Sequence, residues 1–361
     1  MRYISLIISA ASITAVCYVG TATPIIASEN GTQPIAANTQ QAIRKAADRS
    51  VRLIERTSAQ FLNTRTCFTC HTQTLSAIVL RTAHKKGFDV DEQNIKRQAE
   101  RAFEFHNLVK SRKPAGIRVD TVGYGLWALD IGQHAPDSMT EDMTWYLLNF
   151  QKELGHWTVP VDRPPAQASD FTTNYVAIRG LNRYGTKEQE SEIAQRATAV
   201  KRWLKTAEAV DTEDQVFRLR LFNELKMNAT SKKPLVERLI REQHEDGGWA
   251  QKAGMKSDAY ATGSVLVALR VAGNISDDNT AWQRGLAYLL RTQLPDGSWY
   301  VATRAKPEQV YFESGFPHGE DQFISAFATG WAAEALLLAL PTSEPTQILS
   351  EGPTATTPSP R

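Results

Sequence analysis

The sequence predicts an all-α protein in which six helical hairpins close into a ring, an (α/α)6 toroid. Three observations predict this fold. An apolar helix rich in small residues and opened by a polar residue recurs along the chain, amphipathic segments alternate with it, and three turns share one spacing of Gln, Gly and Trp. An open solenoid built from the same helix pairs is the alternative.

The recurring apolar helices are predicted to form the inner ring. Their opening residues are His71, Asp120, Asp170, Asp214, Asp258 and Asp321. Gly and Ala are frequent in these helices, and such small residues allow helix backbones to approach closely. An acid that opens a helix is ordinarily a cap contributing about 0.5–2 kcal/mol, so each acid by itself indicates only a helix start. The last of these helices also resembles a membrane span, but burial is favoured because the other copies are not membrane spans.

Amphipathic segments with charged outer faces separate the inner helices and are predicted to form the outer ring. They cover residues 38–62, 92–112, 138–152, 188–208, 232–244 and 279–293. The toroid domain therefore spans residues 38–340. The links from outer to inner helices, among them 153–169, 245–257 and 294–320, are longer than the return links. Because long loops on one face of a rigid scaffold often carry function, we expect the site on that face.

Three turns carry a resemblance to a known family. Each has Gln, three further residues, Gly, one residue and Trp, and they begin at Gln151, Gln243 and Gln293. The segment RGLAYLL, residues 284–290, runs into the last of these turns, and together they resemble the QW motif of squalene-hopene and related terpene cyclases. The resemblance implies a ring of inner and outer helices, as also found in protein prenyltransferase subunits. We expect Gln to bond carbonyls at the end of an outer helix, Trp to stack on the neighbouring hairpin and Gly to permit the turn.

The N-terminal segment is predicted to direct export. An uncharged apolar run indicates a signal peptide over residues 1–27, with cleavage after Ala22 or Ala27. An uncleaved anchor and a lipoprotein acylated at Cys17 are the alternatives. Residues 28–37 are then a linker. We expect a periplasmic bacterial protein that meets the membrane only through its signal peptide.

The composition limits which classes of binding partner the sequence indicates. The chain has 41 Lys and Arg against 39 Asp and Glu, a formal net charge of +2, which gives no reason to expect nucleic-acid binding. Residues 341–361 are rich in Pro, Ser and Thr and are predicted to be disordered.

Residues 67–71 read CFTCH, the spacing of a c-type haem attachment site. The thiols of Cys67 and Cys70 can each bond a vinyl group of haem, and the imidazole of His71 is then held under the iron as the proximal ligand. The sequence therefore predicts covalent haem c. A disulfide between the two cysteines and a zinc site are the alternatives, although no second Cys pair or close-spaced His pair completes four zinc ligands.

A distal iron ligand is expected from the long-loop face. Closure of the ring brings the loop before Asp321 towards His71, so His318 is the leading candidate. Met255 is the second candidate and His156 the third. Without such a ligand, the iron would keep an open position for a diatomic gas or a peroxide.

The resemblance also implies an acid site. In class II terpene cyclases the middle acid of an Asp-x-Asp-Asp sequence, at the start of an inner helix, protonates an alkene. This chain has Asp211, Glu213 and Asp214 in that arrangement, with Glu in the middle and thus one methylene longer. Clustered, buried carboxyls can keep one another protonated, as a general acid requires. Ordinary helix-start acids are the alternative.

Aromatic residues of the inner helices either line a cavity for an apolar ligand or form core. They are Tyr124, Trp127, Tyr175, Phe217, Phe222, Tyr260, Phe323, Phe327 and Trp331. Taken together, the sequence favours an exported toroid with haem c that transfers electrons, or that uses haem iron to act on or sense a small molecule, with a redox partner or a small apolar ligand. A cyclase or isomerase acting on an apolar substrate is the first alternative, and a non-catalytic binding or scaffold module is the second.

Overall fold

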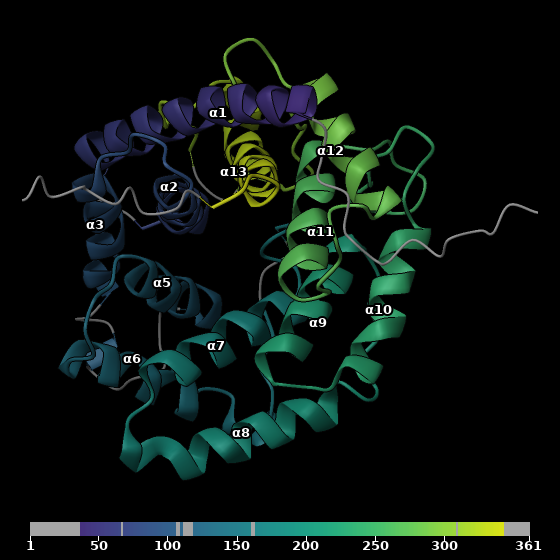
Figure 1. Cartoon of the computed structure of the whole chain (residues 1–361). Helices are drawn as coiled ribbons and strands as arrows, with labels where there is room; N and C mark the ends of the chain where they lie inside the picture. Colours follow the sequence, from purple (N-terminus) through teal and green to yellow (C-terminus); the bar gives the residue numbers. More distant parts are fainter. Residues whose placement is uncertain are drawn as a thin grey trace, which may run out of the picture. The chain divides into compact units, whose positions relative to one another are not determined.

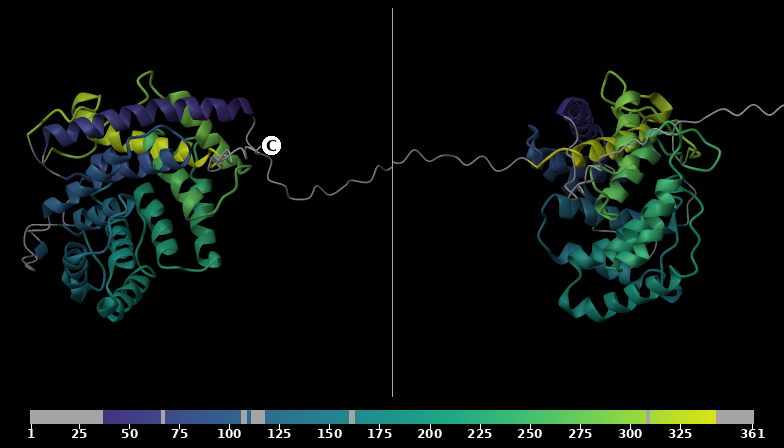
Figure 2. Two further views of the ribbon diagram at one scale, coloured as in Figure 1. Left: turned by 60° about the vertical axis from the view of Figure 1, so that its left-hand side comes forward. Right: turned by 45° about the vertical axis from the view of Figure 1, so that its right-hand side comes forward.

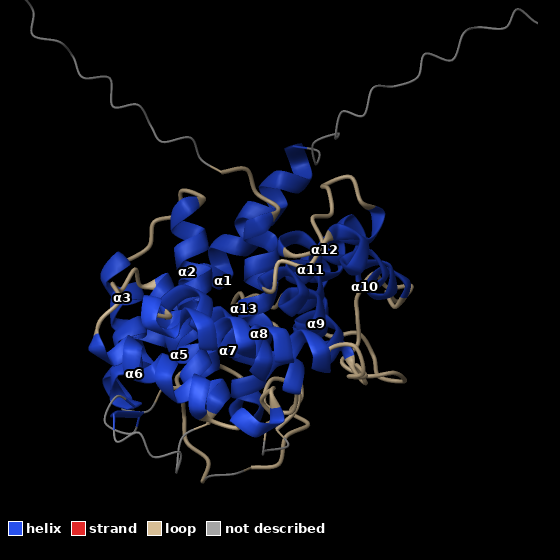
Figure 3. Cartoon of the chain, turned by 90° about the horizontal axis from the view of Figure 1, so that it is seen from below, coloured by secondary structure: helices blue, strands red, loops and turns tan. Residues whose placement is uncertain are grey.

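Paired helices make up the described part of the chain, as the apolar and amphipathic patterns predict. The computed structural model describes residues 37–65, 68–105, 109–110, 118–159, 163–307 and 310–342, all within the unit Gln33–Arg361. The outer helices are α1 (Ala37–Thr64), α3 (Glu92–Glu100), α6 (Ser138–Asn149), α8 (Glu190–Trp203), α10 (Ala229–Arg241) and α12 (Thr280–Thr292). The inner helices are α2 (Leu75–Lys85), α5 (Val119–Ile131), α7 (Asp170–Tyr184), α9 (Thr212–Glu224), α11 (Ala259–Val271) and α13 (Gln322–Leu338). Over these ranges Figure 3 shows helices and loops and no strand.

The inner helices close into a ring (Figure 1). Each packs against the next, from α2 through α5, α7, α9 and α11 to α13, and α13 then returns to α2. Helix α1 lies along both α13 and α2, which Figure 2 shows from two further sides. The contact between the last and the first inner helix excludes an open solenoid and confirms the predicted (α/α)6 toroid.

Hydrogen bonds of the three shared turns join the outer helices. The indole nitrogens of Trp157, Trp249 and Trp299 donate to the carbonyls of Leu147, Leu239 and Leu289, at 3.0, 2.7 and 3.0 Å. Gln243 Nε2 instead donates to the carbonyl of Ala281 in α12, and Gln293 Nε2 to that of Ala46 in α1, both at 2.9 Å. The motif is structural, as expected, and Trp contacts the neighbouring hairpin as predicted: Arg196 of α8 lies over the Trp157 ring at 4.0 Å, and a Cβ added at Gly285 of α12 would lie 3.0 Å from Trp249. In two of the turns Gln also reaches the next outer helix.

Glycines allow the close approach predicted for the inner ring. A Cβ added at Gly263 of α11 would lie 2.6 Å from the backbone nitrogen of Ala332 in α13. A Cβ at Gly123 of α5 would lie 2.9 Å from the carbonyl carbon of Val176 in α7. In the last shared turn, Gly297 has a φ of +91°, a backbone conformation that other residues rarely adopt.

The recurring acids lie at helix starts, although the capping residue differs between repeats. Asp211 and Asp258 are the N-caps of α9 and α11, and each accepts a backbone N–H from the first turn. Ser169 caps α7 in place of Asp170, which is the first residue of that helix. The first inner helix begins with a π-helical turn, η1 (Cys70–Thr74), that continues into α2.

Within the described ranges, no helix is long and apolar enough to cross a membrane. Helix α13 is instead covered by α11, α1 and α2, and most of its residues are buried. The predicted signal peptide, residues 1–27, and all but the first two residues of the predicted tail lie outside the described residues.

Candidate active site

A pocket of about 500 Å³ opens where the inner helices α5 and α13 begin. Its walls come from the first turns of those helices, from Phe68 and Thr69 ahead of η1, and from segments 163–167, 303–307 and 310–312. Two long links from outer to inner helices supply these segments, so the pocket lies on the face of the ring that the loop lengths indicate.

The walls of the pocket combine aromatic rings with a few charges. Tyr124, Phe312, Phe323 and Phe327 supply aromatic surface, and the rings of Phe312 and Phe323 meet edge to face with centroids 5.3 Å apart. The charged residues of the lining are Arg118, Asp120, Arg163, Lys306 and Glu320. An apolar wall with a small number of polar groups is typical of a small-molecule site.

Asp120 is the buried acid of this pocket, with 2% of its surface exposed. Gln167 Nε2 donates to Asp120 Oδ2 at 2.9 Å, and Arg118 Nε lies 3.3 Å from Oδ1. These contacts attach the loop that carries Gln167 to the start of α5. Asp120 therefore acts as a structural anchor of the pocket wall.

The three acids predicted from the Asp-x-Glu-Asp sequence lie together at the start of α9. Asp211 Oδ1 accepts from the backbone N–H of Asp214 at 3.1 Å, and Asp214 Oδ2 accepts from that of Val210 at 3.0 Å. Thr212 Oγ1 donates to the carbonyl of Ala250 at 2.6 Å and so ties the helix start to the loop before α11. Burial raises the pKa of the Asp211 and Asp214 carboxyls above their ordinary values.

Glu213 is held by hydroxyls from the inner helices on both sides. Thr172 Oγ1 of α7 donates to Glu213 Oε1 at 2.8 Å, and the Tyr260 hydroxyl of α11 donates to Oε2 at 3.0 Å. The residue is 3% exposed. Burial, reinforced by the charge of Asp211, raises the pKa of Glu213 to about 8 despite these hydrogen bonds. Glu213 is therefore mostly protonated at neutral pH, the state that a general acid requires.

One aromatic pair links Glu213 to the pocket lining. Glu213 is not part of the pocket lining, whereas Phe327 of α13 is. The Phe327 ring meets the ring of Tyr260 edge to face, with centroids 5.9 Å apart. Tyr260, which holds Glu213, thus contacts Phe327, which lines the pocket.

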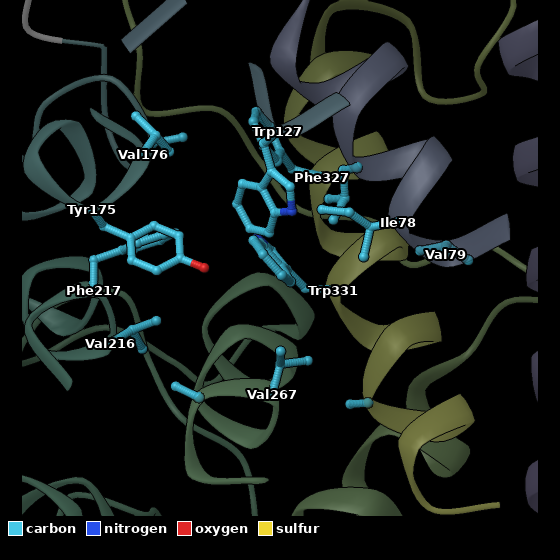
Figure 4. Close-up of a cluster of buried hydrophobic side chains, with 14 of the residues drawn as sticks. Ile78, Val79, Trp127, Tyr175, Val176, Val216, Phe217, Val267, Phe327 and Trp331 are labelled. Carbon is cyan, nitrogen blue, oxygen red and sulfur yellow. The ribbon is translucent and has the colours of Figure 1, made fainter. Parts of the chain in front are cut away.

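Deeper in the ring, aromatic side chains surround a buried arginine. Figure 4 shows Trp127, Tyr175, Phe217 and Trp331 converging from four inner helices. The guanidinium carbon of Arg220 lies 4.9, 4.6, 5.1 and 5.1 Å from the centroids of these rings. We call this arrangement the aromatic cage. Tyr124, Phe323 and Phe327 line the pocket as predicted, but the residues of the cage enclose a cation of the chain itself.

The predicted haem-attachment residues are only partly covered by the structure. Cys67 lies outside the described residues, and of Cys70 and His71 the backbone is described, as the first two residues of η1. Phe68 and Thr69, between the two cysteines, line the pocket. Among the residues searched, no group of three or more His, Cys, Asp or Glu side chains is arranged to hold a metal ion. Haem attachment at this motif stays a prediction.

The three candidate distal ligands lie in separate loops. His318 precedes α13, and its Nε2 lies 2.8 Å from Ser298 Oγ. The ring of His156 stacks on Trp203, with centroids 4.9 Å apart. Met255 is half-buried in the loop before α11. None of the three belongs to the described lining of the pocket.

The hydroxyls that hold the acid were not among the residues expected from the sequence, although the repeat contains a signal for them. Thr172, Glu213 and Tyr260 each stand two residues after an acid at the start of their helix. Since successive inner helices pack side by side in the same register, residues at equivalent positions meet. Arg220 has no such signal, because its partners come from helices far apart in the sequence.

Comparison with sequences of known proteins gives a local match. No family model matches the chain. A squalene–hopene cyclase from Zymomonas mobilis subsp. mobilis is 40% identical over 67 residues, which cover 19% of this chain. The match spans 10% of the length of that curated relative.

Comparison with solved structures extends over most of the chain. The type II terpene cyclase MstE from Scytonema, in complex with merosterolic acid A, has a TM-score of 0.51 and 11% sequence identity, over 86% of this chain and all of that one. The apo structure of MstE gives the same score and identity, over 82% of this chain and 98% of that one. The chain therefore has a terpene-cyclase-like helical fold.

Proposed function

We propose that this chain is a cyclase-type enzyme that protonates an alkene of an apolar, isoprenoid-like substrate and so starts its cyclisation or isomerisation. The observation that carries the proposal is Glu213, a buried carboxyl at the start of an inner helix whose pKa is raised to about 8. Asp211 and Asp214 flank it, in the arrangement that the family resemblance implies. A neutral carboxyl is the form that can give a proton to carbon.

Two likenesses support the substrate class. The local sequence match is to a squalene–hopene cyclase. Complexes of the structurally similar MstE hold geranylgeranyl dihydroxybenzoate as substrate and merosterolic acid A as product. In this chain, the aromatic lining of the pocket suits an apolar chain, since its rings can cover hydrocarbon.

The proposed step is a proton transfer from Glu213. The π electrons of the alkene form a C–H bond, the O–H bond of the acid breaks, and its electron pair stays on the carboxylate. Hydroxyls of Thr172 and Tyr260 donate to the two carboxylate oxygens and stabilise the anion that is left. The carbocation is consumed by attack of a second alkene and finally loses a proton, and a proton from solvent restores the acid.

Reaching the acid requires a side-chain movement. Because Glu213 does not line the pocket and contacts its lining through Tyr260 and Phe327, we expect the substrate to displace one of these rings. Phe327 lines the pocket and is the side chain that an entering chain meets. We therefore expect Phe327 to rotate when substrate binds.

The test is turnover by two Glu→Gln variants on one helix. Wild-type protein is incubated with squalene and with geranylgeranyl substrates, and products are analysed by mass spectrometry. Glu213→Gln keeps the size of the side chain but cannot act as the acid, and we expect turnover to fall by about 100-fold or more. Glu224→Gln, near the other end of α9, is the matched control and should keep wild-type turnover. Full turnover by Glu213→Gln, or no cyclised or isomerised product from the wild type with any substrate, contradicts the proposal.

We further propose haem c on Cys67 and Cys70, with His71 as the iron ligand, in a chain exported to the periplasm. Support comes from the CFTCH sequence and the apolar N-terminal run, and from Phe68 and Thr69, which put the motif next to the pocket lining. Bound haem would supply one-electron chemistry and would call for a redox partner.

A further inference from the structure

Arg220 is a buried cation at the centre of the inner ring. It lies in α9 and is 6% exposed. Its guanidinium group faces four aromatic rings of the aromatic cage, at centroid distances between 4.6 and 5.1 Å. Guanidinium groups stack favourably on aromatic faces, and the effect is larger when both are shielded from water.

Aromatic faces, more than hydrogen bonds, hold this charge. Arg220 Nη2 donates to the Tyr175 hydroxyl at 3.0 Å, and Nη1 has no hydrogen-bond partner among the described residues. Arg220 interacts electrostatically with Glu334 of α13, itself buried and bound by Thr82 at 2.9 Å. The guanidinium therefore fills a space that would otherwise be apolar.

The aromatic cage lies one helical turn below the pocket. In α5, Tyr124 lines the pocket and stacks on Trp127 of the cage, with centroids 6.0 Å apart. In α13, Phe327 lines the pocket and Trp331, one turn further along, belongs to the cage. Two helices thus lead from the pocket wall into the cage.

Arg220 also lies below the acid. It stands seven residues after Glu213 in α9, which places it on the same face of the helix, about 10 Å further along its axis at 1.5 Å per residue. Phe217 lies between them and contributes a ring to the cage. A chain that enters past Glu213 along the ring therefore meets Arg220.

We propose that Arg220 forms the floor of the substrate pocket and sets the longest isoprenoid chain that the ring accepts. This proposal deepens the proposed function and rests on its substrate class. With the guanidinium in the cage, a hydrocarbon chain that has displaced the Phe327 ring ends where it meets the filled cage, at Trp127 and Trp331. Without it, the cage offers aromatic-lined space to a longer chain. Arg220 is then a specificity-determining residue, and it takes no part in proton transfer.

The experiment measures binding as a function of chain length. Geraniol, farnesol and geranylgeraniol are titrated by calorimetry into proteins that also carry Glu213→Gln, so that no turnover intervenes. Arg220→Ala empties the cage, and we expect the ratio of geranylgeraniol affinity to geraniol affinity to rise at least ~10-fold, because more hydrocarbon is buried. Arg220→Met is the matched control, since an unbranched, uncharged side chain still fills the cage, and its ratio should stay near that of the parent.

Tryptophan fluorescence tests whether the longer chain enters the cage. Trp127 and Trp331 contact Arg220, so geranylgeraniol should change the emission of the Arg220→Ala protein more than that of its parent. If Arg220→Ala alone does not fold, the same ratio is measured with Glu334→Gln added, which removes the acid that the substitution leaves unpaired.

Three outcomes overturn the proposal: an unchanged affinity ratio in a folded Arg220→Ala protein, an equal rise in Arg220→Met, or no binding of any of the three alcohols. Because binding is measured without turnover, failure of the proton-transfer chemistry leaves this result interpretable.

Discussion

Gln293, the C-cap of α12, donates its side-chain amide to the backbone carbonyl of Ala46 in α1, at 2.9 Å, across 247 residues of sequence. The bond joins the last outer helix to the first. Gln243 makes the equivalent bond to Ala281, between α10 and α12, within the ring. One motif therefore connects consecutive hairpins and also closes the circle.

We expect Gln293→Leu to lower the free energy of unfolding by about 1–3 kcal/mol, at about 1 kcal/mol for each hydrogen bond lost, because the side chain donates to the carbonyls of Ala46 and Gly297 and accepts from Arg49. Gln243→Leu removes the equivalent pair of donated bonds away from the closure, to the carbonyls of Ala281 and Gly247, and should cost about 1–2 kcal/mol. Urea unfolding of both variants measures the two losses. A loss in Gln243→Leu with none in Gln293→Leu would show that the closing bond contributes nothing.

Turnover should depend on pH through Glu213. The acid acts in its protonated form, and its pKa is raised to about 8, so the rate should be constant below pH 7 and fall as pH rises through about 8. The pH profile of kcat/KM measures this decline. Tyr260→Phe removes a hydrogen bond that lowers the pKa of Glu213, so its decline should shift to higher pH. A profile that rises between pH 7 and 9 would contradict the role of Glu213.

The free energy of unfolding should fall as pH rises, because burial raises the pKa of Glu334. Burial raises its pKa from 4.5 to about 7 in the folded chain, so its stabilising contribution is complete below pH 4.5 and is lost as pH rises through 7. We expect Glu334→Gln to flatten the change in unfolding free energy between pH 5 and pH 8 by on the order of 3 kcal/mol. Urea unfolding at the two pH values tests this, with Glu224→Gln as control. An equally steep pH dependence in Glu334→Gln would be the contrary result.

Covalent haem should depend on both cysteines of the CFTCH motif. Protein made in cells that attach haem c should stain for haem after denaturing electrophoresis. Cys67→Ala together with Cys70→Ala should abolish the stain, and His71→Ala should change the absorption spectrum of any haem that remains. No stain in the wild type removes the haem proposal and leaves the cyclase proposal standing.

The ring could be predicted from the sequence because each repeat contains the local patterns of one outer and one inner helix. Charged outer faces and small inner residues are local patterns, and Gly263 shows their physical reason, since a side chain there would meet the backbone of α13. The grouping of Asp211, Glu213 and Asp214 at one helix start could be predicted as well, because they belong to a local motif.

The surroundings of the acid could not be predicted in the same way. The cage around Arg220 depends on four inner helices, and in a single sequence an arginine suggests a solvated face. The link from Glu213 to the pocket lining depends on the side-chain orientations of Tyr260 and Phe327, which packing determines. The bonds that Gln243 and Gln293 make to the next outer helix likewise depend on which carbonyl each side chain reaches.

The contact of α13 with α2 can form only after the last inner helix has been synthesised. The contacts of α2 with α1, α3 and α5 can form early, whereas its contact with α13, which includes the bond from Thr82 to Glu334, 252 residues later, needs the last helix to be complete. Contacts so distant in sequence slow folding, because a long loop must close before they form. A chain that stops before α13 therefore leaves two open edges, one on α2 and one on α11. Truncation before α13 should thus expose apolar surface at both edges of the incomplete ring and make the shortened protein prone to aggregation.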